Sequence, residues 1–423
     1  MPRRHTTQRL SKMGRRRFVN ALAGLGVSTA AISGLSQEAM ADLVDDPKKE
    51  VPRVLGYVHT DHEAVKNGAS PDREALYYTI SREQWVRIES AHDARQQVEQ
   101  QLDGRFDDIK VWVTTNSNDE KRIDVEVYDD GSLSRKDVEA VEGTTPGSIT
   151  GVAGRGTEAE SAVEGIPVAV ERINIKSEPQ NPVSLESDQE FPDDYYYASD
   201  WDNIPAGAAC FFADADGQGG VGTTCVPVDD GDVKKMLTAG HNLSEMSVDG
   251  ELINPSLGLV WLEDDSPYHF LEDEVVFDDD ERKNVLDAGT MHNTSGNALE
   301  YEFATNHGTT SGDIIGTLSR ERIKDIEDDG TWDDEMTYHQ GARTGEERGY
   351  GIEKVNDNAF QTDIPHDSVQ QGDSGGPYYV RNTSSVSPTP FDLIMGVHSW
   401  SDADENTWGT IMEVIEDELG VEV

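Results

Sequence analysis

The sequence predicts an all-β fold for residues 203–423, preceded by a smaller α+β domain at 42–202. Beyond residue 202, short apolar runs alternate with Gly, Asp and Asn turns, and helical patterns are almost absent. This is typical of a β-barrel or β-sandwich. Residues 42–202 instead combine a long helical pattern with strand patterns. A chain of 423 residues has room for two or three domains and a large core.

Residues 1–41 have the pattern of an export signal. Three arginines at 15–17 are followed by Phe18 and Val19, and an apolar run rich in small residues extends from 21 to 35. Ala-Met-Ala at 39–41 supplies a small-residue cleavage signal. Paired arginines before x-Phe-Val resemble the twin-arginine signal, whose route carries folded proteins. We therefore expect a secreted protein without stable membrane association, with an uncleaved N-terminal anchor as the alternative.

Residues 42–202 contain the patterns of a small α+β domain. Residues 81–102 have helical spacing, with Trp85, Ile88 and Val98 on a broadly apolar side. We expect strands at 110–113, 123–128 and 166–170, a short helix at 134–142, and a linker or flexible loop rich in Gly, Thr and Ser at 143–165. No catalytic constellation lies inside this domain. The Pro- and acid-rich passage at 177–202 is the expected boundary and processing zone.

Residues 203–423 carry the strand patterns of the all-β part. We expect strands at 208–213, 223–228, 233–237, 284–288, 313–318, 348–355 and 393–399, and a closing helix at 411–419. The two cysteines of the chain, Cys210 and Cys225, flank a Gly- and Asp-rich turn. An even pair in an exported protein predicts a disulfide across this hairpin. Two buried thiols are the alternative.

The composition of the chain is strongly acidic. Asp and Glu number 83 against 35 Lys and Arg, a net charge of −48, and the acids are spread from about Asp42 onward. A uniformly anionic surface stays hydrated in concentrated salt, where screening reduces its self-repulsion. We therefore expect adaptation to a saline setting. Nucleic-acid partners are not expected, because such a surface would repel their phosphates.

The loop at 372–377, Gly-Asp-Ser-Gly-Gly-Pro, has the composition of a nucleophile loop. Glycines accept backbone angles that other residues refuse. Such a loop can point the Ser374 hydroxyl outward while neighbouring backbone N–H groups converge on one spot. That is the geometry of a nucleophile beside an oxyanion hole. An ordinary Gly-rich surface turn is the alternative.

A serine nucleophile needs a base and an acid that orients the base. His241 is the expected base, because Leu-Thr-Ala-Gly-His at 237–241 ends an apolar strand in small residues and an imidazole can accept the hydroxyl proton. Asp287 is the expected acid, because it lies inside an otherwise apolar strand and a buried carboxylate requires a partner. Asp273 and Asp313 are the competing acids.

These three segments, in this order, resemble the chymotrypsin-like serine proteases. The steps of 46 residues from His241 to Asp287 and 87 residues from Asp287 to Ser374 suit that family. Residues 341–355 and the chain end from 409 resemble its bacterial secreted branch, which includes streptogrisins and glutamyl endopeptidases, and residues 396–400 resemble the strand that lines the substrate channel. The resemblance covers about residues 204–423. It implies two six-stranded antiparallel β-barrels with the catalytic cleft between them.

The resemblance implies a role for each matched residue. Ser374 is the expected nucleophile, His241 the general base and then acid, Asp287 its orienting partner, and the backbone N–H groups of Gly372 and Ser374 the oxyanion hole. Asp373 is expected to serve structurally. One residue departs from the family pattern: Asn242 stands where a cysteine often follows the histidine. The usual disulfide beside the base is therefore absent, and the local loop geometry is an open point.

The resemblance also implies a substrate pocket lined by Ser368, His398, Ser399 and Trp400. Ser368 stands where relatives that cleave after Lys or Arg carry aspartate, so a tryptic preference is not expected. His398, directly before Ser399, resembles the histidine of glutamyl endopeptidases. An imidazole at the pocket wall could attract an acidic side chain, especially when protonated. A histidine packed in the second barrel, with a pocket for apolar or aromatic side chains, is the alternative.

The sequence thus predicts a secreted serine endopeptidase, expected to be a monomer that acts on protein or peptide substrates. A catalytically inactive protease-fold binding or surface protein is the alternative function. Residues 42–202 have the size and position of a pro-region removed by cleavage within 177–202, with a permanent accessory domain as the alternative. No cofactor is expected. Asp-Ala-Asp-Gly at 214–217 only partly matches a calcium loop, so a simple turn is favoured there, and calcium elsewhere has no located site.

Overall fold

The computed structural model describes most of the chain from Lys49 onward. The described ranges are 49–106, 109–116, 120–129, 135–157, 159–174, 183–186, 204–213, 218–231, 233–246, 252–255, 257–260, 268–277, 286–293, 298–304, 313–326, 336–365, 368–370, 372–382, 391–401 and 407–423. The expected export signal at 1–41 and the partial calcium loop at 214–217 lie outside them. Within these ranges, no helix is both long and apolar enough to span a membrane.

The chain divides into two compact units. One comprises Met1–Tyr57 and Ala75–Asn174, and the other comprises Val58–Glu74 and Ile175–Val423. A short N-terminal segment, Val58–Glu74, therefore belongs to the same unit as His241, Asp287 and Ser374.

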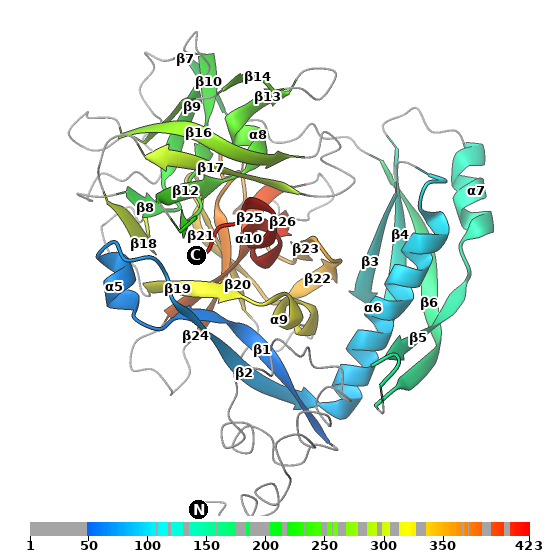
Figure 1. Cartoon of the computed structure of the whole chain (residues 1–423). Helices are drawn as coiled ribbons and strands as arrows, with labels where there is room; N and C mark the ends of the chain where they lie inside the picture. The colour runs from blue at the N-terminus through cyan, green and yellow to red at the C-terminus, as the bar shows by residue number, and fades with distance from the viewer. Residues whose placement is uncertain are drawn as a thin grey trace, which may run out of the picture. The chain divides into compact units, whose positions relative to one another are not determined.

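The first unit packs a long helix against β-strands (Figure 1). Its elements are most of β1 (Glu50–His59) and β2 (Arg73–Ser81), then α6 (Arg82–Leu102), β3 (Ile109–Thr115), β4 (Lys121–Asp129), α7 (Arg135–Thr144), β5 (Ser148–Ala153) and β6 (Ser161–Asn174). The helix predicted at 81–102 is confirmed, and Ser81 caps it by accepting a hydrogen bond from the Gln84 N–H. Trp85, Ile88 and Val98 are buried, as their spacing predicts.

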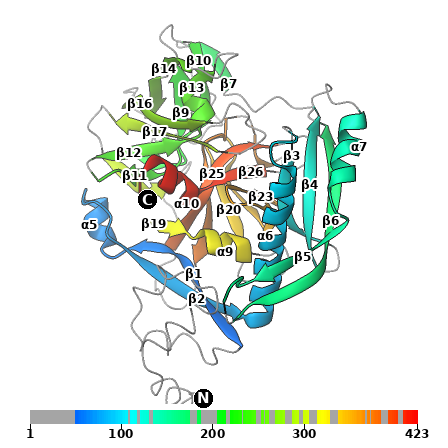
Figure 2. The same ribbon diagram turned by 45° about the vertical axis from the view of Figure 1, so that its right-hand side comes forward.

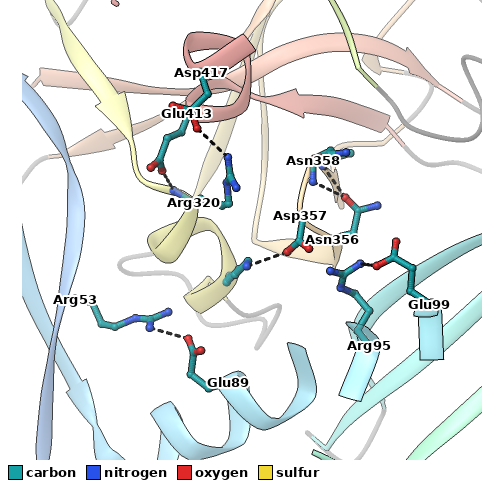
Figure 3. Close-up of polar contacts among 12 residues, drawn as sticks. Arg53, Glu89, Arg95, Glu99, Arg320, Asn356, Asp357, Asn358, Glu413 and Asp417 are labelled. Carbon is teal, nitrogen blue, oxygen red and sulfur yellow. Dashed lines mark hydrogen bonds and ion pairs between the residues drawn. The ribbon is translucent and has the colours of Figure 1, made fainter. Parts of the chain in front are cut away.

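Two arginines make ion pairs with glutamates of α6 (Figure 3). Arg53 Nη1 lies 2.7 Å from Glu89 Oε1, and Arg95 Nη1 lies 3.0 Å from Glu99 Oε2. The second pair spans one helical turn, the spacing at which opposite charges on a helix meet.

The stretch predicted as a linker or flexible loop at 143–165 instead contributes two strand segments to a sheet. It contains β5 and the start of β6, which pair antiparallel. Gly151 accounts for part of the glycine content, because a Cβ at this position would lie 1.8 Å from the carbonyl oxygen of Ser90 on α6. The glycine permits helix and strand to approach closely. Close packing therefore explains the glycine at position 151, whereas an added Cβ at Gly143, Gly147, Gly156 or Gly165 would meet nothing within 4 Å.

The second unit consists of β-strands with short helices. Its first group of elements is α5 (His62–Lys66), β7 (Val183–Glu186), β8 (Ile204–Ala206), β9 (Ala209–Ala213), β10 (Gln218–Thr223), β11 (Pro227–Asp229), β12 (Lys234–Thr238), α8 (Gly240–Leu243), β13 (Ser244–Met246), β14 (Leu252–Pro255), β15 (Leu257–Val260), β16 (Tyr268–Phe277), β17 (Asp287–Asn293) and β18 (Leu299–Phe303). Its second group is β19 (Asp313–Leu318), α9 (Arg320–Asp325), β20 (Thr337–Gly341), β21 (Gly345–Gly349), β22 (Ile352–Val355), β23 (Ala359–Thr362), β24 (Pro377–Asn382), β25 (Phe391–Ser401), β26 (Thr407–Ile411) and α10 (Met412–Leu419).

The first group contains an eight-stranded sheet in the order β11-β12-β17-β16-β15-β9-β10-β7. β9 and β10 form the hairpin predicted between the two cysteines. β12 and β17 are antiparallel, with Thr238 opposite Gly289. This register brings the end of β12, which precedes His241, to the beginning of β17, which carries Asp287.

The second group is organised around the long strand β25. It pairs with β24 and β26 antiparallel and with β19 in parallel, while β20 joins β21 to β24, and β23 joins β22 to β26. The predicted closing helix is present as α10, which lies against β25 (Figure 2). The all-β character of this part is confirmed, whereas its closure into two six-stranded barrels stays a prediction.

Polar contacts hold the closing helix to α9 (Figure 3). The backbone N–H of Arg320 donates to Glu413 Oε2 at 2.6 Å, and the Arg320 guanidinium lies 3.5 Å from Asp417 Oδ2. Ser319 caps α9 through the Arg322 N–H. These contacts fix the start and the exposed side of α10.

The predicted disulfide does not form. Cys210 and Cys225 are both buried and are not joined to each other. Cys210 lies opposite Gly222 on β10 and packs in a cluster with Met236, whereas Cys225 lies beyond β10 and packs in a cluster with Leu237. The two thiols thus fill different parts of the core as small apolar groups. Burial also raises the pKa of the Cys225 thiol.

Candidate active site

His241 lies on a one-turn helix directly after a buried strand. β12 is buried from Lys235 to Thr238, and α8 begins at Gly240. The Thr238 hydroxyl donates to the carbonyl oxygen of Thr223 at 2.7 Å, which ties the end of β12 to the end of β10. The apolar strand that ends in small residues therefore presents His241 at a fixed position, as the sequence predicts.

Asp287 contacts His241 through both carboxylate oxygens. Oδ2 lies 2.7 Å from His241 Nδ1, and Oδ1 accepts the backbone N–H of His241 at 2.9 Å. Both side chains are less than a tenth exposed. A carboxylate can only accept here, so the Nδ1 atom carries the hydrogen and the Nε2 atom is left as the basic nitrogen. The carboxylate fixes the tautomer and the orientation of the ring.

Asp313, one of the two competing acids, has other partners. It lies 3.3 Å from Lys66 Nζ and 3.7 Å from His62 Nε2. The side chain of Asp273, the other competitor, lies outside the described part of β16. Of the candidate acids, Asp287 is the one that the structure brings to His241.

Ser374 lies in a tight turn packed against the rest of the unit. Gly375 has a φ of +93°, and a Cβ there would lie 2.3 Å from both the carbonyl oxygen of Thr223 and the hydroxyl of Thr238. Gly372, with a φ of +108°, is also in the region that favours glycine. The backbone angles predicted from the glycines are confirmed. The outward-pointing serine is not, because Ser374 has no exposed surface: the loop lies among Thr223, Thr238 and β25.

Asp373 has the structural role predicted for it. Its side chain is fully buried and accepts the backbone N–H groups of Gln370, Arg343 and Thr344 and the hydroxyl of Thr344, at 2.8 to 3.2 Å. Burial raises the pKa of this carboxyl although the hydrogen bonds oppose the shift. Gly341 permits the approach, because a Cβ there would lie 2.2 Å from Asp373 Oδ1. The carboxylate thereby fixes the loop that carries Ser374.

Asn242 answers the open point about the missing cysteine. Its side chain is buried and donates from Nδ2 to the carbonyl oxygen of Ser374 at 2.8 Å and to the Thr238 hydroxyl at 3.1 Å. The Thr223 N–H donates to the same Ser374 oxygen at 2.8 Å. Sequence reasoning missed both contributions. The departure from the family pattern at Asn242 was the signal for the first, whereas Thr223 gave none.

His398 lies in a buried group of aromatic rings. Its Nδ1 atom is 2.8 Å from the Tyr378 hydroxyl, and its ring meets the His339 ring edge-on at 5.0 Å between centroids. All three side chains have no exposed surface. Burial lowers the pKa of His339 to about 3, so this imidazole is neutral at neutral pH. Sequence reasoning found no signal for Tyr378 or His339, which lie on β24 and β20, two strands that it did not predict.

Of the other expected pocket residues, Ser399 and Trp400 lie on β25 and Ser368 lies before the serine turn. Ser399 is buried, with its hydroxyl 3.2 Å from that of Thr410. The hydroxyl of Ser368 hydrogen-bonds to Glu347, whose pKa is raised by burial. The backbone of Trp400 pairs with Trp408, while the Trp400 side chain lies outside the described residues. No described residues form a group of three or more His, Cys, Asp or Glu side chains suited to a metal ion.

One protein-family model matches this chain. The trypsin family, described as Trypsin, matches residues 329–416, a range that contains Ser374 and His398 and neither His241 nor Asp287. No curated protein matches.

Several solved protease structures match about half of the chain. A protease described as glutamic acid specific, with a histidine triad in substrate binding, has 16% identity, covers 52% of this chain and 100% of its own, and gives a TM-score of 0.33. Protease A of Thermobifida fusca has 18% identity, 52% and 97% coverage and a TM-score of 0.34. The alpha-lytic protease homolog N4 has 13% identity, 52% and 98% coverage and a TM-score of 0.32. The trypsin-family model therefore matches a segment of this chain, residues 329–416, that includes Ser374.

Proposed function

We propose that this chain is a serine endopeptidase in which Ser374 is the nucleophile, His241 the general base and then acid, and Asp287 the residue that orients His241. The observation that carries the proposal is the pair of contacts from the Asp287 carboxylate to His241, at 2.7 and 2.9 Å. A carboxylate that holds the Nδ1 hydrogen leaves Nε2 ready to accept a hydroxyl proton. Asn242 links the same helix to Ser374.

The reaction follows from these roles. The Ser374 oxygen attacks the carbonyl carbon of the peptide while its proton passes to His241 Nε2. The N–H groups of Gly372 and Ser374 stabilise the oxyanion of the tetrahedral intermediate. His241 gives the proton to the departing amine, and the C–N bond breaks. Water, activated in turn by His241, then hydrolyses the Ser374 ester and restores the enzyme.

Labelling with a fluorophosphonate probe in molar salt tests the proposal. The full chain should form one covalent adduct on Ser374, and the Ser374→Ala variant none. The His241→Ala variant should label at least about a hundredfold more slowly, because general-base catalysis contributes roughly 10²–10⁴ in rate. Absence of a Ser374 adduct on folded protein would favour the inactive binding or surface protein.

We further propose that the pocket prefers acidic side chains, with His398 as the contact. The Tyr378 hydroxyl is 2.8 Å from His398 Nδ1. If that hydroxyl donates, the neutral ring carries its hydrogen on Nε2, and that hydrogen can be donated to a substrate carboxylate. Glu347, which hydrogen-bonds to Ser368, supports the opposite preference, for a basic side chain.

A peptide-library digest separates the two preferences. Cleavage after Glu should dominate, and the Tyr378→Phe variant, which removes the hydroxyl beside His398, should lose that preference about tenfold relative to cleavage after Leu. Dominant cleavage after Lys or Arg, abolished by Glu347→Gln, would establish the basic pocket instead.

We also propose that the protein is exported by the twin-arginine route and acts as a monomer in concentrated salt. The basis is the arginine pattern at 15–17 and the net charge of −48. Replacing Arg15 and Arg16 together by Lys should retain the chain inside the cell, while the same change at Arg3 and Arg4 should not. The purified protein should lose folded structure as salt is removed, because screening of its negative charges is lost.

A further inference from the structure

The segment Val58–Glu74, here called the clasp, lies far from Ser374 in sequence yet belongs to the same compact unit. It contains the end of β1, the short helix α5 and the start of β2. The Thr60 N–H donates to the carbonyl oxygen of Asp72 at 2.7 Å, which closes the segment on itself. Asp61 caps α5 by accepting the Ala64 N–H at 3.0 Å. Figure 1 shows α5 beside β18.

One apolar side chain of the clasp is part of the core of the unit. Val65 is 2% exposed and shares a cluster with Tyr301, Ala239, Ala288 and Val423. Ala239 and Ala288 are close in sequence to His241 and Asp287. The Lys234 ammonium also donates to the carbonyl oxygen of Val65. The clasp therefore completes the core that supports the histidine–aspartate pair.

The Lys and Arg side chains of the clasp contact acids in the rest of the second unit. Arg73 Nη1 lies 2.7 Å from Glu416 Oε1 and its Nη2 lies 3.2 Å from Glu422. Lys66 lies 2.8 Å from Glu302 and 3.3 Å from Asp313. The chain has only 35 Lys and Arg for 83 acids. Both of these scarce cations are therefore used to neutralise acids outside the clasp.

Glu416 shows why the unit needs Arg73. Its side chain is only 7% exposed, and the Thr317 hydroxyl and the Val423 N–H also donate to its Oε1. Burial raises the pKa of this carboxyl, while Arg73 opposes the shift. Loss of the clasp would leave a buried carboxylate without this cation, which strongly disfavours the folded state.

His59 binds the last residues of the structure. Its Nε2 atom lies 2.9 Å from the carbonyl oxygen of Val423, and its Nδ1 lies 2.9 Å from His62 Nδ1. The neighbouring Glu422 pairs with Asp229 of β11. The clasp thus contacts Val423, and the neighbouring Glu422 in turn contacts the eight-stranded sheet at β11.

We propose that the clasp is a permanent part of the protease unit and is retained when the chain is cut between Glu186 and Ile204. Its binding surface on the remainder of the unit is formed by Tyr301, Glu302, Glu416 and Val423. The mature protein is then a two-chain complex held by this surface and by the pairing of β7 with β10, and the N-terminal part is not released as a pro-region. The inference stands without the proposed peptidase activity.

Controlled cleavage of the full chain tests the proposal. A recognition site for a sequence-specific endopeptidase is placed between Glu186 and Ile204 in the Ser374→Ala background, which prevents self-cleavage. After complete cutting in molar salt, size-exclusion chromatography should recover both fragments in one peak. The double variant Val65→Ala/Arg73→Ala should raise the dissociation constant of the fragments at least about a hundredfold. Arg155→Ala, which removes an exposed pair with Asp93 in the first unit, should not.

Hydrogen exchange of the chain without the double substitution gives a second measurement, which does not depend on whether the double variant folds. The Val65 N–H, bonded to the carbonyl oxygen of Asp61 at 3.2 Å, should keep the same protection before and after cutting. Two results would overturn the proposal: separation of the unsubstituted fragments with the C-terminal one still folded, or loss of Val65 protection on cutting. Co-elution of the double variant as tightly as the unsubstituted fragments would equally refute the role of the clasp.

Discussion

The side-chain amide of Asn242 donates a 2.8 Å hydrogen bond to the carbonyl oxygen of Ser374. Asn242 is the residue after the proposed base, His241, and this contact joins it to the proposed nucleophile, Ser374. Chymotrypsin-like proteases often brace the base with a disulfide from the same position. Here a neutral hydrogen bond, supported by Thr238 and Thr223, occupies that place.

Replacing Asn242 with Ala should lower both activity and stability. The Ser374 carbonyl would keep the Thr223 N–H and lose the amide, so the nucleophile loop would be held by one donor. We expect kcat to fall about tenfold with a smaller change in KM, because small misplacements of reacting groups are costly. The free energy of unfolding should fall by about 1–3 kcal/mol. Steady-state kinetics and denaturant unfolding in molar salt measure the two effects.

Asn356→Ala is the matched control for Asn242→Ala. The Asn356 side chain also makes two hydrogen bonds, to the N–H groups of Asn358 and Ala359, in the turn after β22 (Figure 3). Its loss should reduce stability and leave kcat unchanged. An equal fall of kcat in both variants would show that Asn242 acts only through general stability.

Replacing Gly375 with Ala should prevent formation of the serine turn. Its φ of +93° already disfavours alanine, and the added Cβ would lie 2.3 Å from the Thr223 carbonyl oxygen. The left-handed conformation alone costs roughly 1–2 kcal/mol, and the collision adds to it. We expect loss of folded protein or at least about a hundredfold slower fluorophosphonate labelling.

Gly231→Ala separates the two causes. Gly231 has a φ of +90°, and a Cβ there meets nothing within 4 Å. This variant should lose roughly 1–2 kcal/mol of stability from backbone strain alone and should label normally. If both glycine variants behaved alike, close packing around Gly375 would not be the limiting factor.

The free energy of unfolding should decrease on acidification, because His59 binds a proton less readily in the folded chain than in the unfolded chain. Burial lowers the pKa of His59 from 6.5 to about 4 in the folded state, and the nearby charges of Arg73 and Lys234 add to the shift. Between these values the unfolded chain binds a proton that the folded chain does not, so the free energy of unfolding decreases as pH falls from 6.5 to 4. The contribution is about 2 kcal/mol after allowance for solvent screening.

The His59→Gln variant isolates this contribution. Gln can still donate to the Val423 carbonyl oxygen and has no ionisation in this range. Unfolding midpoints at constant salt, compared at pH 7 and pH 4.5, should differ less in the variant than in the unsubstituted protein. An identical acid dependence would assign the effect to another group, such as His62, whose pKa is also lowered by burial.

Replacing Gly151 with Ala should destabilise the first unit. The added Cβ would lie 1.8 Å from the carbonyl oxygen of Ser90, so α6 and β5 must separate. Overpacking typically costs about 1–3 kcal/mol. Hydrogen exchange of the α6 amides should therefore accelerate. Gly147→Ala, where a Cβ meets nothing within 4 Å, should leave exchange unchanged.

The sequence by itself determined the all-β character of the second half, the long helix after Ser81 and the pairing of His241 with Asp287. The catalytic roles of these two residues and of Ser374 stay predictions. These predictions depend on local properties: helical spacing, a strand that ends in small residues, a lone carboxylate in an apolar strand, and glycines that permit positive φ. The His241–Asp287 contact then follows from the pairing of β12 with β17. For this pair, the contact in the folded structure is the one that the local sequence patterns predict.

Only the tertiary structure decided how these parts are held. The predicted disulfide is absent because Cys210 and Cys225 pack in different clusters. The expected linker contains β5 and the start of β6, and Gly151 permits β5 to lie close to the backbone of α6. Asn242 binds Ser374 across 132 residues, and Arg73 binds Glu416 across 343. Such contacts depend on which surfaces meet after folding, and the residues near each partner in the sequence do not encode them.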